Sequence, residues 1–111
     1  MRNTRSGRPV ATVIEGALDS ASRKRGLLGR DSLPPGHALI IAPSNLVHTF
    51  AMRFSIDILF VSREGRVLKM RTNVPPRRVA GAFGAFAVVE LAGGELELSD
   101  TQVGDLLDVV S

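Results

Sequence analysis

Short apolar runs separated by turn residues recur along this chain, and their pattern indicates β-strands rather than long helices. The turn signals return about every 8–12 residues, a spacing typical of a β-sandwich or a β-barrel. We expect about seven short strands, within residues 9–18, 37–42, 46–52, 56–62, 66–74, 85–92 and 103–110. The pattern therefore predicts a mainly β fold with a sandwich or barrel-like arrangement.

One short helix is expected near the N-terminus, over residues 19–28. Asp19 or Ser20 supplies the N-cap of this helix, and Gly29 ends it. Gly26 lies inside the helix and costs about 1 kcal/mol of helix stability relative to alanine. The prediction is thus a mainly β domain with one short N-terminal helix.

Turn chemistry is clear in some connecting segments and ambiguous in others. The segment SREG at residues 62–65 is predicted to be a compact hairpin turn, with Gly65 in the left-handed conformation. Residues 79–84 (VAGAFG) are too rich in glycine and alanine to assign. Residues 95–102 fit either an alternating strand or a short helix, so both possibilities stay open.

The length of the chain, 111 residues, is enough for one domain with one hydrophobic core. We expect this domain at residues 9–111, after a flexible basic tail at residues 1–8 that contains Arg2, Arg5 and Arg8. No stretch approaches the roughly 20 apolar residues that span a bilayer. We also recognise no secretory leader, which favours a cytoplasmic location and leaves a periplasmic one open.

Composition and charge narrow the range of functions. Aromatic residues make up only 5% of the chain, with no Trp or Tyr, which disfavours nucleic-acid binding by base stacking. The absence of cysteine excludes disulfides, thiolate metal sites and cysteine nucleophiles. All 14 basic residues precede Glu90, whereas 6 of the 11 acidic residues lie from Glu90 onward. This asymmetry fits either a basic surface that attracts anions or an acidic end that packs against the basic body.

Asp57 is the one charged residue of an otherwise apolar strand at residues 56–61. A strand that is apolar on both faces is usually buried on both faces. A carboxylate there is costly unless it is paired or hydrogen-bonded, and Arg53, His48 or backbone N–H groups are candidate partners. Asp57 is therefore either a carboxylate on the floor of a pocket or a structural carboxylate that fixes a turn.

The preceding segment adds His48 and Thr49 to this group. In an extended chain His48 shares a face with Phe50 and Met52, and Thr49 points to the other face. A histidine in this position can act as a general base or contact an anion. The alternative is a neutral histidine that is hydrogen-bonded to the backbone.

Metal and hydrolase chemistry are poorly supported by the sequence. His37 and His48 are the only histidines, and a zinc site without cysteine would need both of them and a carboxylate. No serine lies in a G-x-S-x-G motif. We therefore predict neither a metal nor a cofactor.

The segment RKRGLLGR at residues 23–30 places four cations around Gly26 and Gly29. Such a segment can approach a phosphate or carboxylate closely, and a KH-type clamp uses a Gly-x-x-Gly loop to hold RNA. Pro34 and Pro35 cut off the second helix that such a clamp requires. The alternatives are contact with a small anion or a simple helix end with a solvated basic face.

The chain resembles the domain of unknown function 192 (DUF192) family in several segments that appear in order. They are SRKRGLLGR at 22–30, LPPGHALII at 33–41, VHTFAMRFSIDILFVSREGRVL at 47–68, VPPRRVAGAFGA at 74–85, VVELAGG at 88–94 and VGDLL at 103–107. The resemblance covers about residues 10–110 and departs from the family pattern at LAGG, where Pro-Ala-Gly is more usual. It implies a small β fold with a short N-terminal helix and supplies no activity.

The resemblance also marks individual positions. Those to which we assign structural roles are Gly26, Gly29, Gly65, Pro75, Glu90 and Gly104. The candidate ligand-binding residues are His48, Thr49, Arg53, Asp57, Arg23 and Arg30.

The leading hypothesis is a soluble, monomeric binding module with a shallow polar pocket. Its expected ligand is a small anionic or polar molecule or a peptide segment. The alternative is a hydrolase or lyase in which Asp57 orients His48 as the base. A third interpretation makes all of these residues structural.

Overall fold

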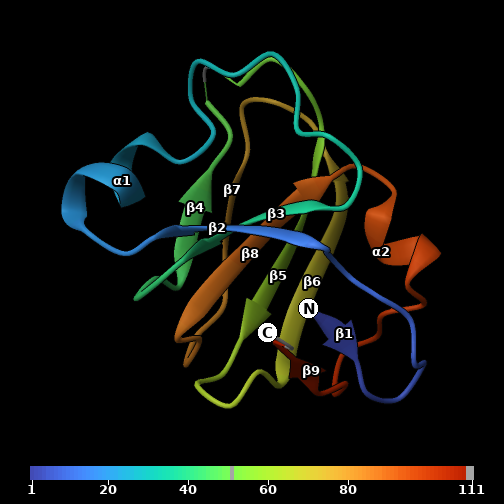
Figure 1. Cartoon of the computed structure of the whole chain (residues 1–111). Helices are drawn as coiled ribbons and strands as arrows, with labels where there is room; N and C mark the ends of the chain where they lie inside the picture. The colour runs from blue at the N-terminus through green and yellow to red at the C-terminus, as the bar shows by residue number, and fades with distance from the viewer. Residues whose placement is uncertain (51, 110–111) are drawn as a thin grey trace.

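A mixed sheet of five strands forms the centre of the computed structural model, which describes residues 1–50 and 52–109 (Figure 1). The elements are β1 (Arg2–Asn3), β2 (Val13–Ala17), α1 (Ser20–Arg25), β3 (His37–Ile41), β4 (Leu46–His48), β5 (Ile56–Val61), β6 (Val67–Val74), β7 (Val79–Gly81), β8 (Ala87–Ala92), α2 (Glu95–Leu98) and β9 (Leu107–Asp108). The predicted mainly β fold with a short N-terminal helix is confirmed. The described residues contain nine strands rather than about seven, because β1 and β7 lie in segments that the apolar pattern did not mark.

The strand order in the central sheet is β2-β3-β8-β5-β6. Among the strands that the structure describes, β2 and β3 are the one parallel pair, and α1 lies in the connection between them. The strands β5 and β8 are the most enclosed, and all six residues of β5 are buried. Burial on both faces explains why these two segments read as almost continuous apolar runs.

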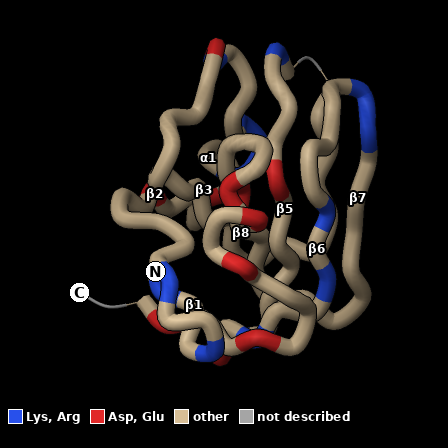
Figure 2. Tube along the Cα trace, turned by 90° about the vertical axis from the view of Figure 1, so that its right-hand side faces the viewer, with Lys and Arg blue, Asp and Glu red and all other residues tan. Residues whose placement is uncertain are grey.

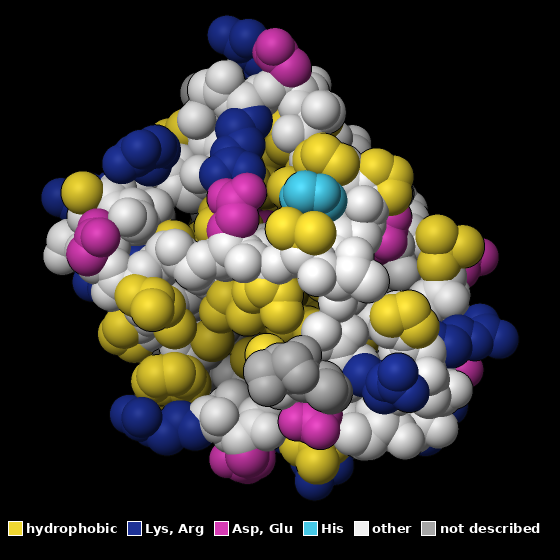
Figure 3. Space-filling model, viewed as in Figure 1, with side chains coloured by type: hydrophobic (Ala, Val, Ile, Leu, Met, Phe, Trp, Pro, Cys, Tyr) yellow, Lys and Arg dark blue, Asp and Glu magenta, His cyan; other side chains and the backbone are white. Residues whose placement is uncertain are grey.

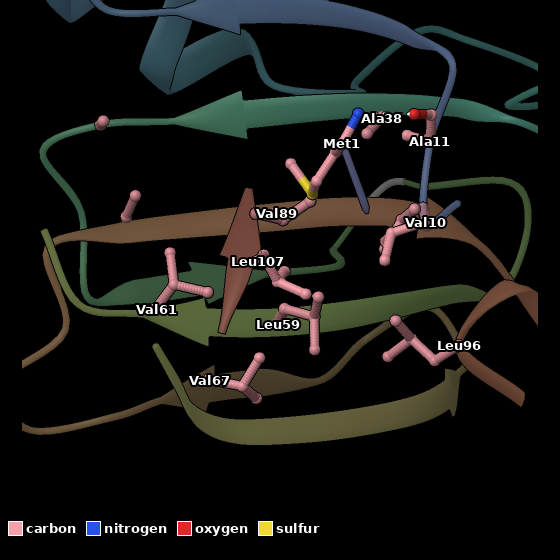
Figure 4. Packing of buried hydrophobic residues seen from close by; sticks show 13 residues of the cluster. Met1, Val10, Ala11, Ala38, Leu59, Val61, Val67, Val89, Leu96 and Leu107 are labelled. Carbon is pink, nitrogen blue, oxygen red and sulfur yellow. Dashed lines mark hydrogen bonds between the residues drawn. The ribbon is translucent and has the colours of Figure 1, made fainter. Parts of the chain in front are cut away.

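Each face of the central sheet packs against its own hydrophobic layer. On one face, Met1, Leu96 and Leu107 surround Leu59 of β5, as Figure 4 shows. On the other face, Leu27 and Val47 pack against residues of β5 and β8 such as Phe60. The two-stranded ribbons β1–β9 and β4–β7 thus contribute to opposite layers.

The structure differs from the prediction at residues 1–8, which we expected to form a flexible tail. Arg2 and Asn3 form β1, which pairs with β9 in an antiparallel ribbon. The Asn3 side chain is fully buried, and its Nδ2 donates to Asp105 Oδ2 at 2.8 Å. The partners of this segment come from the other end of the chain, so local sequence could not reveal them.

Part of the basic N-terminal segment pairs with the acidic C-terminal part of the chain. Arg5 Nε donates to Asp105 Oδ1 at 2.7 Å, and this bond is the main cause that lowers the pKa of Asp105 to about 2. Figure 2 shows acidic positions gathered in the middle of its view, with basic positions along β6 and in the segment just before β7. In Figure 3, basic and acidic side chains are intermixed with apolar patches over the visible face.

The helices resolve two further points. Asp19 caps α1 by accepting from Ser22 N at 2.7 Å, as predicted, but the helix ends at Gly26 rather than at Gly29. Gly26 has a φ of 49° and donates its N–H to Ser22 O, a backbone conformation that L side chains rarely adopt. The ambiguous segment at 95–102 begins with the short helix α2. Neither helix in the described residues is long and apolar enough to cross a membrane.

Candidate functional site

A pocket of about 430 Å³ lies between α1 and β4. Ile41 of β3 and Glu90 of β8 form its floor. Leu27 and Met52 form an apolar wall. Ser20, Arg23, Lys24 and Arg25 line it from α1. Pro43, Ser44, Leu46, Val47 and His48 line it from β4 and the residues just before that strand. The site therefore combines a cationic rim, an apolar wall and a single acid.

Glu90 reaches the floor because of its register in the sheet. It pairs with Leu39 of β3 on one side and with Ile58 of β5 on the other. Cross-strand partners point to the same face of a sheet, and Leu39 and Ile58 both belong to the layer below α1. The chain after α1 passes close by, since an added Cβ at Gly26 would lie 3.8 Å from Glu90 Oε1.

The carboxyl of Glu90 is the most perturbed group of the pocket. Its residue is only 3% exposed, and burial raises its pKa to about 7, although the positive charge of Arg30 opposes this rise. Within residues 1–50 and 52–109 no hydrogen bond to this carboxyl occurs. Because no described buried side-chain oxygen lacks a partner, the oxygens of Glu90 are accessible from the pocket.

The rim of the pocket carries three consecutive cations from α1. Arg23 is held in place, because its Nη1 donates to Leu18 O at 2.6 Å. Lys24 and Arg25 are exposed, and neither forms an ion pair with a described carboxylate. The rim therefore offers positive charge that other residues of the described chain do not neutralise.

His48 lies at the edge of the same pocket. Its side chain is exposed, and its ring centroid lies 5.8 Å from that of Phe50. The structure thus brings together two of the candidate ligand-binding residues, His48 and Arg23.

Thr49 is buried and faces away from the pocket. Its hydroxyl donates to Pro75 O at 2.7 Å and accepts from Arg78 N at 2.9 Å. These bonds fix the loop that connects β6 to β7. Thr49 and Pro75 therefore hold the backbone beside β4 in place.

Asp57 lies on the opposite face of the sheet from Glu90. It is fully buried, and its two oxygens accept from Asn73 N at 2.8 Å, Gly94 N at 3.1 Å and Leu96 N at 2.9 Å. It borders a different hollow, beside α2, that does not include His48. The pairing of His48 with Asp57 that the enzyme hypothesis requires does not form.

The two remaining arginine candidates are bound to surface carboxylates. Arg53 Nη1 lies 2.6 Å from Asp31 Oδ1 on the surface. Arg30 forms two hydrogen bonds with Glu15, at 2.7 and 3.2 Å. Neither arginine lines the pocket, although the charge of Arg30 acts on Glu90 from nearby.

Glu90 and Gly26 both line the pocket, although the sequence had indicated structural roles for them. The sequence did contain a signal for Glu90, because this residue interrupts an apolar strand in the same way as Asp57.

Of the predicted backbone glycines, Gly65 shows its role most directly. Its φ is 95°, and an added Cβ would meet Leu107 O at 2.5 Å. Gly29 and Gly104 also have positive φ values.

Histidines and carboxylates do not converge on a metal site in the part of the chain that the structure describes. No group of three or more such side chains is positioned to hold an ion there. The chemistry available in the pocket is therefore hydrogen bonding by Glu90, charge from the rim and apolar contact with its walls.

Comparison with known proteins shows that the chain matches a family model. The model of the DUF192 family, described as "Uncharacterized ACR", matches residues 1–109. A crystal structure of a protein of unknown function from Novosphingobium aromaticivorans is similar, with a TM-score of 0.84 and 26% identity over 96% of this chain and 81% of that one.

A second solved structure agrees on the fold. It comes from Sinorhizobium meliloti and bears the name "putative transcription regulator", with a TM-score of 0.79 and 22% identity over 86% of this chain and 79% of that one. No curated protein matches the chain.

Proposed function

The chain belongs to the DUF192 family of uncharacterized proteins, and we propose that it is a binding module whose ligand occupies the pocket between α1 and β4. One observation carries this proposal. Glu90 is a buried carboxyl that opens onto a cavity and has no hydrogen-bond partner within the described residues. Asp57 shows the structural alternative, because backbone N–H groups saturate its carboxylate, whereas the oxygens of Glu90 are left open to whatever occupies the pocket.

From the residues that line the pocket, we expect the ligand to contain three kinds of chemical group. A group that can hydrogen-bond, such as an amide or a hydroxyl, meets Glu90 on the floor. An apolar body lies against Leu27 and Met52. A carboxylate or another anion faces Lys24 and Arg25 at the rim, because these cations attract negative charge. The ligand is therefore a small amphiphilic anion or a peptide segment with the same groups.

N-acetylated amino acids contain all three parts and serve as probes. We expect N-acetylserine, N-acetylglutamine and N-acetylvaline, added in an NMR titration, to shift the amide signals of Gly26, Leu27 and Glu90. The Leu46→Trp variant should abolish these shifts, because its larger side chain fills the mouth of the pocket at an exposed position.

Leu68→Trp is the matched control, since Leu68 is an exposed strand residue that does not line the pocket. It should leave the shifts intact. The proposal fails if none of the probes perturbs pocket signals up to millimolar concentration, or if the same shifts persist in the Leu46→Trp variant.

A second candidate function is acid–base catalysis by Glu90. Its pKa of about 7 is well placed for a group that both accepts and releases a proton, and His48 lines the same pocket. In this version Glu90, rather than Asp57, is the acidic residue of a hydrolase. Methyl esters of the same N-acetylated amino acids test it by NMR. Hydrolysis that disappears in Glu90→Gln supports the enzyme, and binding without turnover supports the module.

A further inference from the structure

The strand β4 has one edge without a strand partner. Among the described residues it pairs with β7 alone, in a two-stranded antiparallel ribbon. Thr49 N donates to Arg78 O at 2.8 Å and Ala82 N donates to Asn45 O at 3.0 Å, so the backbone groups of residues 45 and 49 face β7.

Alternation along an antiparallel strand decides where the intervening groups point. Since Asn45 and Thr49 face β7, the N–H and C=O groups of Leu46 and His48 face the other way. Within the described residues, the hydrogen bond from Ser44 Oγ to Leu46 O at 3.1 Å is the one that reaches this edge. As far as the described residues reach, two N–H groups and one carbonyl thus remain available for an added strand.

This unpaired edge borders the pocket. Leu46 and His48 line it together with Arg23 and Lys24 of α1, and Figure 1 shows β4 between α1 and β7. The site is therefore a groove between a helix and an unpaired strand edge, with Glu90 at its floor. Extended peptides bind in such places by adding a strand, which supplies main-chain hydrogen bonds, while pockets receive alternate side chains.

Charge selects the occupant. Three cations line the groove from α1, and Glu90, which lies at the floor, is the only acid among its lining residues. Lys24 and Arg25 are exposed and lack ion pairs with described carboxylates. An acidic segment would neutralise this rim, whereas a basic segment would be repelled.

We propose that the groove binds an extended acidic peptide segment of a partner protein as an added strand on β4. Every second side chain of that segment points toward the floor, and its carboxylates lie near Lys24 and Arg25. This inference rests on the proposed function of the pocket, and it identifies the ligand as a polypeptide rather than a free small molecule.

Three hexapeptides with blocked ends test the proposal. Each alternates valine with one variable residue, which is glutamate, serine or lysine. We expect the glutamate peptide to bind most tightly and the lysine peptide at least about tenfold more weakly. On binding, the amide protons of Leu46 and His48 should become protected from hydrogen exchange.

Backbone methylation distinguishes strand addition from other modes of binding. Two versions of the glutamate peptide carry methyl groups on alternate sets of backbone nitrogens. Only one set pairs with β4 in an added strand, so one version should lose binding and the other should keep it. If both versions bind like the parent peptide, or both lose binding alike, strand addition is excluded.

Charge reversal tests the rim. The double variant Lys24→Glu with Arg25→Glu should weaken the glutamate peptide about tenfold, and these exposed residues make no described ion pair that the change would break. Arg71→Glu is the matched control, because Arg71 is an exposed cation on β6 outside the groove. An equal loss in both variants would show non-specific attraction and overturn the proposal.

The remaining outcomes separate this inference from the proposed function. If N-acetylated amino acids bind and no hexapeptide does, the ligand is a small molecule and only the inference fails. If neither kind of probe binds, both fail. Dimerisation through β4 in sedimentation experiments would also overturn the proposal that β4 binds an acidic peptide. Tighter binding of a single-stranded RNA oligonucleotide than of any peptide would overturn it as well.

Discussion

Two buried carboxylates on neighbouring strands of the central sheet have opposite surroundings. Asp57 lies opposite Leu91, and Glu90 lies opposite Ile58, one register step away. Asp57 points to the face that α2 covers and accepts three backbone N–H groups. Glu90 points to the face below α1 and opens onto a pocket.

The difference comes from the backbone that each carboxyl meets. The turn after β8 and the start of α2 present the N–H groups of Gly94 and Leu96 to Asp57. The segment after α1 approaches Glu90 at Gly26 but donates no hydrogen bond to it. An acid within an apolar strand can therefore have either environment, and the surrounding backbone decides whether its carboxylate is saturated by N–H groups or left open to a pocket.

The largest expected effect is the loss of the Asp57 carboxylate. Asp57→Ala leaves three N–H groups, one buried and two partly buried, without their acceptor, and we expect the free energy of unfolding to fall by about 3–5 kcal/mol. Urea denaturation followed by circular dichroism measures this change. Asp108→Ala is the control, since Asp108 is exposed on β9, and it should change stability by less than about 0.5 kcal/mol. A loss below about 1 kcal/mol for Asp57→Ala would refute the structural role.

The second prediction concerns Glu90, whose ionised carboxylate is expected to destabilise the folded protein, unlike that of Asp57. The pKa of Glu90 is about 7 in the folded protein against an ordinary value of 4.5. Between these pH values the folded state binds more protons than the unfolded state, so stability falls as pH rises from 4.5 to 7. At about 1.4 kcal/mol per pH unit, ionised Glu90 costs about 3 kcal/mol at pH values above its folded pKa.

Glu90→Gln removes this cost because glutamine does not titrate. We expect the variant to be more stable than the wild type by up to about 3 kcal/mol in alkaline buffer and to lose this advantage near pH 4.5. Urea denaturation at both pH values measures the difference. Glu97→Gln, an exposed acid on α2, should show no such pH dependence. A variant that is less stable than the wild type in alkaline buffer would contradict the prediction.

The two acids also show how far the sequence alone can lead. The apolar pattern located every strand of the central sheet, and most clearly β5 and β8, because burial on both faces leaves a local signal. It identified Asp57 as costly in that setting and allowed backbone N–H groups as its partners, which the structure contains. The same reasoning applied to Glu90 would have marked it as well.

Other features had no local signal. The ribbon of β1 and β9 joins residues about a hundred positions apart, as in the pairing of Asn3 with Leu107, so residues 1–8 read as a tail. The pocket depends on how the chain after α1 packs over the sheet, and for that reason the sequence could not place Arg23 and His48 in the same pocket. Both the β1–β9 ribbon and the pocket depend on long-range packing rather than on local secondary-structure propensity.

The smallest expected effect concerns the charge that acts on Glu90 from a distance. Arg30 pairs with Glu15 in a partly exposed ion pair, so Arg30→Gln should cost less than about 1 kcal/mol of stability. Because the positive charge of Arg30 lowers the pKa of Glu90, its removal should raise that pKa above about 7, which a carbon-13 NMR titration of the carboxyl measures. Arg53→Gln removes a comparable surface cation that pairs with Asp31 and should leave the pKa of Glu90 unchanged. An unchanged pKa in Arg30→Gln would mean that burial alone sets the protonation of Glu90. A rise confined to that variant would show that the Arg30–Glu15 pair tunes the acid at the floor of the pocket.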